Sequence, residues 1–332
     1  MRELDILTFS NYSTWNRCRK DWEWRNVVGV VKKEISPALR FGTLIHEGLH
    51  ALRKGRQLGE IWKILETKTA QLGGDTTELL KAKAMLCGYQ RTYGDETAKV
   101  LHNEERFETD IWNPETGYPS KTFRRAGKID CITKEEDGLW VRETKTTTTL
   151  GEGYLLKLWL DAQIAFYVLA AQINYGYEIK GCIYDVLVKS SLKQGKGETE
   201  QEYEERAAEL RAKSKNGTTT AKRKLPESDE DFEARLTEQY AEQKMFHREK
   251  IYVGQDALKL LESELWNACK EIREAKAANF FRRNTDACFK WNRPCQYHPL
   301  CSSSGNTDAL IQNMYEYKEP NAELLDTENE ET

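Results

Sequence analysis

The stretch Gly127-Lys128-Ile129-Asp130, followed by Arg142-Glu143-Thr144-Lys145-Thr146, decides the fold of this chain. Both stretches are typical of β-strands, and a glycine-marked turn lies between them. Alternate residues of a strand point to the same face, so Glu143 and Lys145 project together and Asp130 can meet them from the neighbouring strand. Two carboxylates this close repel each other unless a hard cation lies between them, and Mg²⁺ or Mn²⁺ accepts oxygen ligands in such an arrangement. The sequence therefore predicts a metal-dependent hydrolase.

One helix is expected before this strand pair in the sequence, and another is expected after it. Residues 41–52 repeat phenylalanine, leucine and isoleucine at three-and-four spacing, which predicts a helix that carries His46 beside its apolar stripe. A second helix is expected from about residue 154 to 175, where Gln163 and Tyr167 lie four apart and share one face. These two side chains can contact a phosphate or brace the metal site.

The cysteines form a second pattern. Of eight, the last three are spaced as Cys288-x6-Cys295-x5-Cys301, and Cys18 near the N-terminus is the best candidate for a fourth ligand, because three thiolates leave a tetrahedral or cubane site incomplete. Zinc and iron–sulfur clusters both accept four thiolates, and His298 also allows a Cys₃His zinc site without Cys18. The other four cysteines are expected to be reduced, buried and inert; they are Cys87, Cys131, Cys182 and Cys269.

Together these motifs resemble the PD-(D/E)XK nuclease superfamily, whose core is an acid, a short gap and then acid-x-lysine on paired strands. Gly42-x-x-x-His46 before the acids and Gln163-x-x-x-Tyr167 after them resemble its RecB-like branch. One cysteine before the core and three after it resemble the iron–sulfur nucleases of that branch, including CRISPR-adaptation, AddB-type and phage-encoded members. The first acid follows Gly-Lys-Ile rather than proline, so the literal motif is not matched.

The resemblance implies an α/β, restriction-endonuclease-like core, in which helices flank a small mixed sheet and a Cys₄ cluster joins the N- and C-terminal helical segments. It implies a Mg²⁺ or Mn²⁺ ion whose ligands are His46, Asp130, Glu143 and the Thr144 carbonyl. The implied catalytic residues are Asp130, Glu143, Lys145, Gln163 and Tyr167. It also implies a [4Fe–4S] cluster, with structural Zn²⁺ as the alternative, on Cys18, Cys288, Cys295 and Cys301.

The implied activity is a DNA exonuclease that acts on single strands or DNA ends in recombination, repair or phage DNA processing. In this chemistry the metal lowers the pKa of a bound water, and Lys145 orients that water or stabilises charge developing on the phosphorus. The imidazole ligand favours Mn²⁺ over Mg²⁺. Two other functions stay open, a non-catalytic DNA-binding or adaptor subunit and a PD-(D/E)XK endonuclease. A recombination or replication partner protein and a homo-oligomer are both compatible with these functions.

Each motif also has a purely structural interpretation. A helix histidine such as His46 is often an ordinary half-buried residue, and Asp130 can simply cap the turn that follows its strand. Glu143 and Lys145 can belong to a solvated strand edge that blocks aggregation. Val141 and the threonine run favour an interior strand instead.

Composition sets the broad class. The 332 residues suffice for one large or two modest domains, and the net charge of −4 does not indicate a nucleic-acid-binding protein. Acidic residues gather in about 198–242 and 319–332, whereas basic clusters at 17–20, 121–128 and 282–283 flank the proposed site. No apolar run is long enough to cross a bilayer and the N-terminus lacks a signal-peptide core, so we expect a cytoplasmic protein without membrane contact. Reducing conditions favour metal ligation over disulfides.

Five segments are expected along the chain. Residues 1–100 form a helical region whose first helix is capped by Ser10 and runs through Cys18 and Trp22. Residues 101–191 form the catalytic core, with strands near 107–111, at 123–133, 138–146 and 179–188. Residues 192–245 form a charged, flexible insertion with too little apolar surface to fold. Residues 246–305 carry a strand at 250–253, a helix from about 256 to 281 and the cysteine cluster, and 306–332 form an acidic tail.

Overall fold

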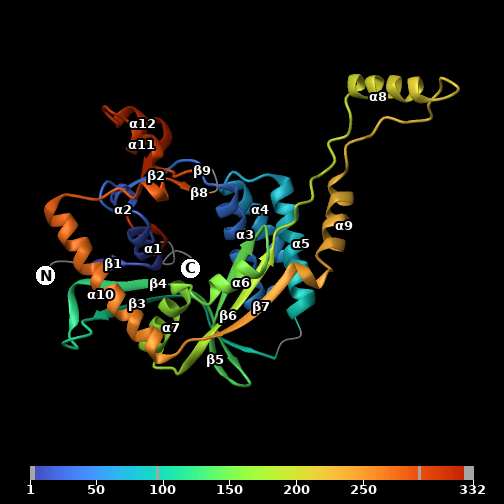
Figure 1. Ribbon diagram of the computed structural model, residues 1–332. Coiled ribbons are helices and arrows are strands. Elements are labelled where there is room, and N and C mark those ends of the chain that lie inside the picture. Colours follow the sequence, from blue (N-terminus) through green and yellow to red (C-terminus); the bar gives the residue numbers. More distant parts are fainter. Residues whose placement is uncertain (1–3, 95–96, 291–292, 325–332) are drawn as a thin grey trace.

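The structure is a computed structural model that describes residues 4–94, 97–290 and 293–324. Six strands of this described part form a mixed central sheet in the order β1-β4-β5-β6-β7, with β3 paired to β4 (Figure 1). Their bounds are β1 (Asp5–Leu7), β3 (Lys99–Trp112), β4 (Pro119–Glu135), β5 (Gly138–Thr147), β6 (Ile179–Val188) and β7 (Phe246–Tyr252). β1 pairs with β4 and β5 with β6 in parallel, and the other pairs are antiparallel. The predicted α/β class with a mixed central sheet is confirmed.

The strand pair β4–β5 lies inside the sheet, between β3 and β6. Cys131 faces Arg142 across the antiparallel pair, and Glu143 faces Tyr184 of the parallel neighbour β6. Val141 and Thr144 are fully buried, and the side chain of Glu143 is 2% exposed. The solvated-edge interpretation of this strand is therefore wrong, because β5 has a hydrogen-bonded neighbour on both sides.

Helices cover both faces of the sheet and enclose two hydrophobic cores (Figure 1). On one face α1 (Phe9–Arg17), α7 (Ala162–Tyr175) and α10 (Gln255–Ala278) bury apolar residues of the sheet such as Phe107 and Val186. On the other face α3 (Pro37–Arg53), α4 (Leu58–Gln71), α5 (Thr76–Tyr93) and α9 (Asp229–Gln239) pack around Leu187 and Phe246. α3, α4 and α5 all lie within the helical region expected over residues 1–100.

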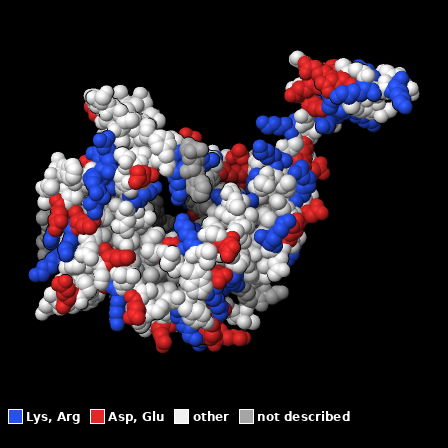
Figure 2. All heavy atoms as spheres, viewed as in Figure 1, with Lys and Arg blue, Asp and Glu red and all other residues white. Residues whose placement is uncertain are grey.

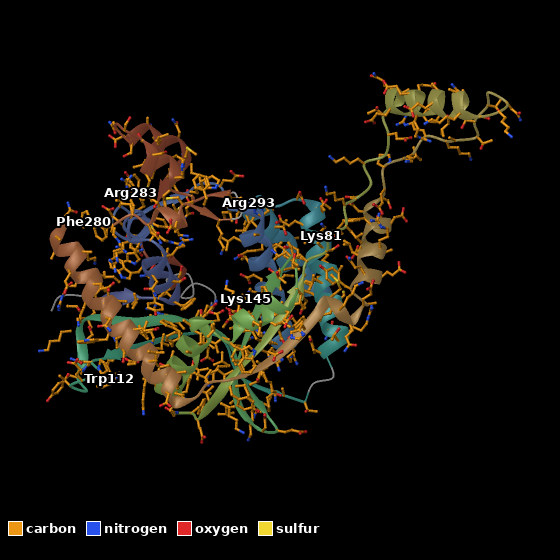
Figure 3. The ribbon with its side chains drawn as sticks, viewed as in Figure 1. Lys81, Trp112, Lys145, Phe280, Arg283 and Arg293 are labelled. Atoms are coloured by element: carbon orange, nitrogen blue, oxygen red, sulfur yellow. The ribbon has the colours of Figure 1, made fainter. Side chains whose placement is uncertain are left out.

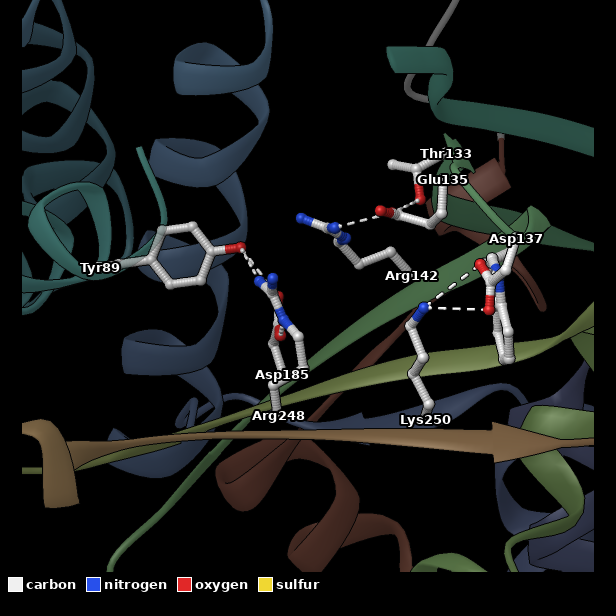
Figure 4. Close-up of polar contacts among 9 residues, drawn as sticks. Tyr89, Thr133, Glu135, Asp137, Arg142, Asp185, Arg248 and Lys250 are labelled. Atoms are coloured by element: carbon white, nitrogen blue, oxygen red, sulfur yellow. Dashed lines mark hydrogen bonds and ion pairs between the residues drawn. The ribbon is translucent and has the colours of Figure 1, made fainter. Parts of the chain in front are cut away.

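A buried ionic network joins the second group of helices to the sheet (Figure 4). The fully buried Asp185 on β6 accepts a hydrogen bond of 2.9 Å from Arg248 Nη2 on β7 and one of 2.8 Å from the Tyr89 hydroxyl on α5. The Arg248 guanidinium also stacks 3.8 Å from the ring centroid of Tyr93. A buried carboxylate needs such partners because its desolvation is costly, and here they fix α5 against the catalytic sheet.

The N-terminal segment forms two helices where one was predicted. The hydroxyl of Thr8, rather than Ser10, accepts the cap hydrogen bond of α1 from the Asn11 amide at 3.2 Å. Cys18 has an extended backbone with φ −163°, and α2 (Arg19–Asn26) begins directly after it. The break between the two helices therefore falls at a predicted cluster ligand.

The helix predicted over 154–175 is also divided. α6 (Glu152–Leu158) ends before Trp159, and Asp161 caps α7 by accepting a 3.0 Å hydrogen bond from the Gln163 amide. By length and hydropathy, Glu152–Tyr175 passes as a membrane span, contrary to the expectation that no apolar run does. In the structure this run is interrupted, and α7 buries Ile164, Phe166, Val168, Ala170 and Ala171 in the core.

The remaining segments differ from their predicted outlines. Residues 192–245 are not without structure, because α8 (Glu200–Lys213) begins with a capping box and α9 buries Phe232 and Leu236 in the second core. The central sheet draws β1 from the N-terminal region and β7 from the segment after residue 245, so it extends beyond 101–191. Within the expected acidic tail, α12 (Asp308–Met314) leads to β10 (Tyr315–Tyr317), which pairs with β2 (Val30–Lys32). The rest of that tail, 325–332, lies outside the described residues.

Candidate active site

The two motif acids and the lysine meet at the ends of β4 and β5. The Thr144 amide donates to Asp130 Oδ2 at 3.3 Å, which holds this carboxylate against β5. Lys145 Nζ contacts Glu143 Oε1, so the two residues share the face predicted from their spacing. Lys145 lies near the centre of the molecule (Figure 3), and the space-filling view shows a hollow in the central part of the same face (Figure 2). Glu143 and Lys145 could be placed together from the sequence because alternate residues of a strand point to the same face.

His46 reaches the same point from α3. Ser36 caps this helix, Pro37 occupies its first turn, and Phe41, Leu44, Ile45 and Leu49 fix its apolar face in the core. His46 Nδ1 lies 3.3 Å from Asp130 Oδ2 and 3.8 Å from Glu104 Oε1. One ligand atom from each of His46, Glu104 and Asp130 lies within 4.8 Å of the other two, which is a geometry that can hold a metal ion.

Glu104 belongs to this site, and the sequence did not reveal it. It lies on β3 between Asn103, which faces Cys131, and Glu105, which faces Ile129, so the antiparallel register places it opposite Asp130 on β4. Its φ of +59° is uncommon for a residue with a Cβ, and such conformations cluster at functional sites. Lys128 Nζ holds its other oxygen at 3.0 Å. In the sequence, the only signal of Glu104 is that it precedes Glu105 directly. Two acids in a row interrupt the alternation of side-chain types that is expected of a strand.

The predicted pair on α7 contacts the second acid. Gln163 Nε2 donates to Glu143 Oε1 at 3.2 Å and lies 3.3 Å from the Tyr167 hydroxyl. The carboxylate of Glu143 is thus held between an amide from α7 and the ammonium of Lys145. This arrangement orients Glu143 and leaves its second oxygen, Oε2, buried without a hydrogen-bond partner among the described residues, although Glu143 is not among the three residues whose ligand atoms lie within 4.8 Å of one another.

The electrostatics show an excess of negative charge at this point. The Asp130 carboxylate raises the pKa of His46 to about 10. Burial is the strongest influence on Asp130 and acts to raise its pKa, but the charge and hydrogen bond of His46, together with the charges of Lys145 and Arg53, outweigh it and the net shift is downward. Burial, followed by the charge of Asp130, raises the pKa of Glu143. Glu143 in turn holds the pKa of Lys145 above its usual range despite burial, so the ammonium stays charged.

The donor set fits a hard divalent cation. Glu104 Oε1 and Glu143 Oε2 are buried oxygens without a hydrogen-bond partner among the described residues. Buried carboxylate oxygens rarely remain unpaired, and a cation satisfies them directly. His46, Glu104, Asp130 and Glu143 would hold a Mg²⁺ or Mn²⁺ ion. Thr144 is fully buried between the two acids; its amide contacts Asp130 and its hydroxyl lies 3.4 Å from Arg53 Nη2.

The four predicted cluster cysteines converge in space although they lie at opposite ends of the chain. Cys18, Cys288, Cys295 and Cys301 line one small cavity, and His298 lines it with them. Trp24 Nε1 donates to Cys301 Sγ at 3.3 Å and the Asn284 amide to Cys18 Sγ at 3.4 Å. Donors around sulfur are typical of metal-bound thiolates.

The other cysteines have the buried character that was expected, with one exception. Cys131, Cys182 and Cys269 are buried, and burial raises the pKa of each thiol, so they stay protonated at neutral pH. Cys87 on α5 is only half-buried. One basic cluster also differs from expectation, since Arg125 is fully buried and lies 3.4 Å from Glu262 Oε2 rather than facing solvent.

Comparison with known proteins agrees with this geometry. A family model described as the PD-(D/E)XK nuclease superfamily matches residues 6–302, a range that contains the acids, the lysine, His46, Glu104 and all four cluster cysteines. No curated protein matches the chain with significant similarity. Members of this superfamily hydrolyse phosphodiester bonds in DNA and use divalent metals such as Mg²⁺ or Mn²⁺. The chain belongs to the PD-(D/E)XK nuclease superfamily.

Proposed function

We propose that this nuclease is a DNA exonuclease of the RecB-like iron–sulfur branch, which acts on single strands or DNA ends in recombination, repair or phage DNA processing. The observation that carries the proposal is the convergence of His46, Glu104 and Asp130 within 4.8 Å, beside the Glu143–Lys145 pair. The motif order along the chain supports the RecB-like assignment. The four convergent cysteines support the iron–sulfur assignment.

Each residue of the site has a defined task in phosphodiester hydrolysis. A bound Mg²⁺ or Mn²⁺ ion supplies a water of lowered pKa and shields the phosphate charge. Lys145 stays protonated beside Glu143 and stabilises the charge that develops on the phosphorus oxygens. Gln163 and the Thr144 amide orient Glu143 and Asp130, respectively. The imidazole of His46 favours Mn²⁺ over Mg²⁺.

The exonuclease assignment is tested with DNA that has no ends. Labelled linear and covalently closed circular DNA, each single- and double-stranded, are incubated with the purified protein and Mn²⁺. We expect progressive shortening of the linear molecules and intact circles. Linearised circles would show an endonuclease of the same superfamily. Binding without cleavage of any of these molecules would favour the non-catalytic adaptor.

The order of the cysteines, one before the core and three after it, supports an iron–sulfur cluster over zinc through its resemblance to the iron–sulfur nucleases. Both kinds of site accept four thiolates, so the metal itself must be identified. Anaerobically purified protein should be brown and contain iron; a colourless protein that contains stoichiometric zinc would overturn this assignment.

A further inference from the structure

A second polar feature lies away from the metal centre, between α1 and the short hairpin formed by β8 (Phe289–Lys290) and β9 (Arg293–Pro294). A cleft of about 930 Å³ separates these two elements. Cys288 and Cys295 flank the hairpin, and the Cys295 amide donates to the Cys288 carbonyl at 2.7 Å. We call this feature the strand cleft, and it is lined by residues of α1, α2 and the 286–290 and 293–296 segments.

One wall of the strand cleft is a hydroxyl-bearing face of α1. Ser10, Ser13, Thr14 and Arg17 recur at helical spacing and all line the cleft. Hydroxyls and arginine donors are the groups that contact phosphate oxygens in protein–DNA complexes. None of these four residues is needed for the first hydrophobic core, which α1 enters through Tyr12 and Trp15 on its other side.

The cleft carries uncompensated positive charge. Its lining includes four cationic side chains, Arg17, Arg25, Lys290 and Arg293, and among the described lining residues a single carboxylate, Asp286. Arg17 is paired with Asp21. The charge of Arg25 also acts on Asp21, whereas none of the ion pairs within the described part of the chain includes Lys290 or Arg293. This local excess contrasts with the chain's net charge of −4 and fits a polyanionic ligand.

An exposed aromatic ring at the cleft can distinguish single-stranded DNA from duplex DNA. Phe289 is 57% exposed, and one edge of its ring is held by His298 at a centroid distance of 5.2 Å. Exposed aromatic rings in a basic groove stack with unpaired bases, whereas the bases of a duplex stack on one another. A single strand therefore uses both the cations and the ring, while a duplex uses only the cations.

The strand cleft is continuous with the helix that supports the active site. Phe9, which lines the cleft, packs on Phe166 of α7 at 5.7 Å between ring centroids, and Phe166 is the neighbour of Tyr167. In Figure 3, Arg293 lies above Lys145 near the centre of the molecule. We propose that the strand cleft binds single-stranded DNA a few nucleotides away from the metal centre. This inference rests on the proposed nuclease function and adds the place where the uncleaved strand is held.

Binding, measured without cleavage, tests the proposal. Fluorescence anisotropy with a labelled single-stranded oligothymidylate in the presence of a chelator gives Kd for the wild type and for the K290A/R293A double variant. We expect the double variant to bind at least about tenfold more weakly, and the slope of log Kd against log salt concentration to fall by about 1.4. The K259A/R273A variant on the outer face of α10 removes the same charges and should bind like the wild type.

A second variant keeps the charges and removes the ring. F289A should weaken binding of the single strand while leaving its salt slope and the binding of a duplex unchanged. Wild-type Kd values for both K290A/R293A and F289A would overturn the strand cleft, even if the protein cleaves DNA. Weakened binding in a protein that cleaves nothing would retain the strand cleft and refute the nuclease function. Circular dichroism confirms that the exposed substitutions leave the fold intact.

Discussion

The candidate metal centre includes Glu104, a residue that does not belong to the sequence motifs. Its backbone adopts a φ of +59°, and its buried Oε1 lies 3.8 Å from His46 Nδ1 without a hydrogen-bond partner in the described structure. The strained backbone directs this oxygen to the cluster, where a cation satisfies it. We infer that Glu104 is a ligand, not a structural acid.

Substitution of Glu104 tests that inference. Glu104→Gln keeps the size of the side chain but removes the charge, so we expect Mn²⁺ affinity to fall about tenfold or more and cleavage to fall with it. Isothermal titration measures the affinity. Glu105→Gln is the matched control, because Glu105 is exposed and contacts His102 and Tyr175 instead. Equal Mn²⁺ affinity in both variants would exclude Glu104 from the metal site.

The pH dependence follows from the raised pKa values of His46, to about 10, and of Glu143. A group whose pKa is raised on folding stabilises the fold below its unfolded-state pKa, and this contribution is lost as pH rises through the folded-state pKa. The metal-free protein should therefore lose thermal stability from neutral pH towards about pH 10. The metal displaces the same protons, so Mn²⁺ affinity should rise from about pH 6 to about pH 8. An affinity independent of pH would contradict these assignments.

At the residue scale, sequence reasoning succeeded where local geometry is sufficient. Glu143 and Lys145 share a face because strands alternate, and Gln163 and Tyr167 share a face because helices repeat. Glu104 was missed because its place beside Asp130 depends on the register of β3 against β4 and on its positive φ, and residue types alone reveal neither.

At the scale of elements, the packing of α5 on α9 is the least expected contact. A Cβ at Gly88 would lie 2.6 Å from the Tyr240 backbone oxygen and 2.8 Å from Phe246 Cζ. The close approach therefore requires glycine. The insertion predicted over 192–245 ends in a helix that belongs to the second core, where Phe232 and Leu236 are fully buried before the chain returns to the sheet at β7.

Two helical glycines give a matched test of this packing. Gly88→Ala should destabilise the fold by about 1–3 kcal/mol, because backbone and a buried ring must move. Gly42→Ala, where nothing lies within 4 Å of the added Cβ, should be neutral or stabilising by about 0.5–1 kcal/mol. Denaturant unfolding measures both. A similar change in stability for the two variants would show that α5 and α9 are not in close contact.

Element boundaries were predicted unevenly. The strand expected at 179–188 has those bounds, whereas the strand expected near 107–111 spans Lys99–Trp112 and the one expected at 250–253 spans Phe246–Tyr252. The helix breaks at Cys18 and at 159–161 were missed, because apolar periodicity continues across both. In the first case the extended residue is a predicted cluster ligand, so the break and the cysteine site are linked.

At the scale of the whole molecule, residues 195–227 form an arm that extends away from the body (Figure 1). The arm is held by its own contacts: the Tyr203 hydroxyl donates to the Ala221 carbonyl at 3.1 Å, and Arg206 Nη2 to Glu198 Oε2 at 2.8 Å. Its base is closed where the Glu227 amide donates to the Gly195 carbonyl at 2.8 Å. The arm is therefore an independent structural unit.

Removal of the arm should leave the body intact. Replacing residues 196–226 by a short glycine–serine linker joins the closed base, so we expect a change in stability below about 1 kcal/mol. Phe232→Ala, just beyond the base, should cost about 3–5 kcal/mol because this ring is fully buried. Calorimetric unfolding compares the two. A large loss of stability on removal of the arm would mean that it packs on the body.

The topology of the whole molecule was only partly predictable. The α/β class follows from the order of strands and helices, but the pairing of β1 with β4 and of β2 with β10 joins residues far apart in sequence. The same long-range closure brings Cys18 to the three C-terminal cysteines. From the sequence, this contact between Cys18 and the C-terminal cysteines was expected only because the cysteine pattern resembles that of a known family.

The central claim is that one cation site, completed by Lys145, hydrolyses phosphodiester bonds. The most direct measurement is the rate of cleavage of labelled linear DNA with Mn²⁺ by the wild type, Lys145→Ala and the control Lys134→Ala, an exposed lysine of the same sheet. The account predicts that Lys145→Ala loses at least about 100-fold in rate while DNA and Mn²⁺ still bind, and that Lys134→Ala cleaves normally. Cleavage by Lys145→Ala at the wild-type rate would contradict it.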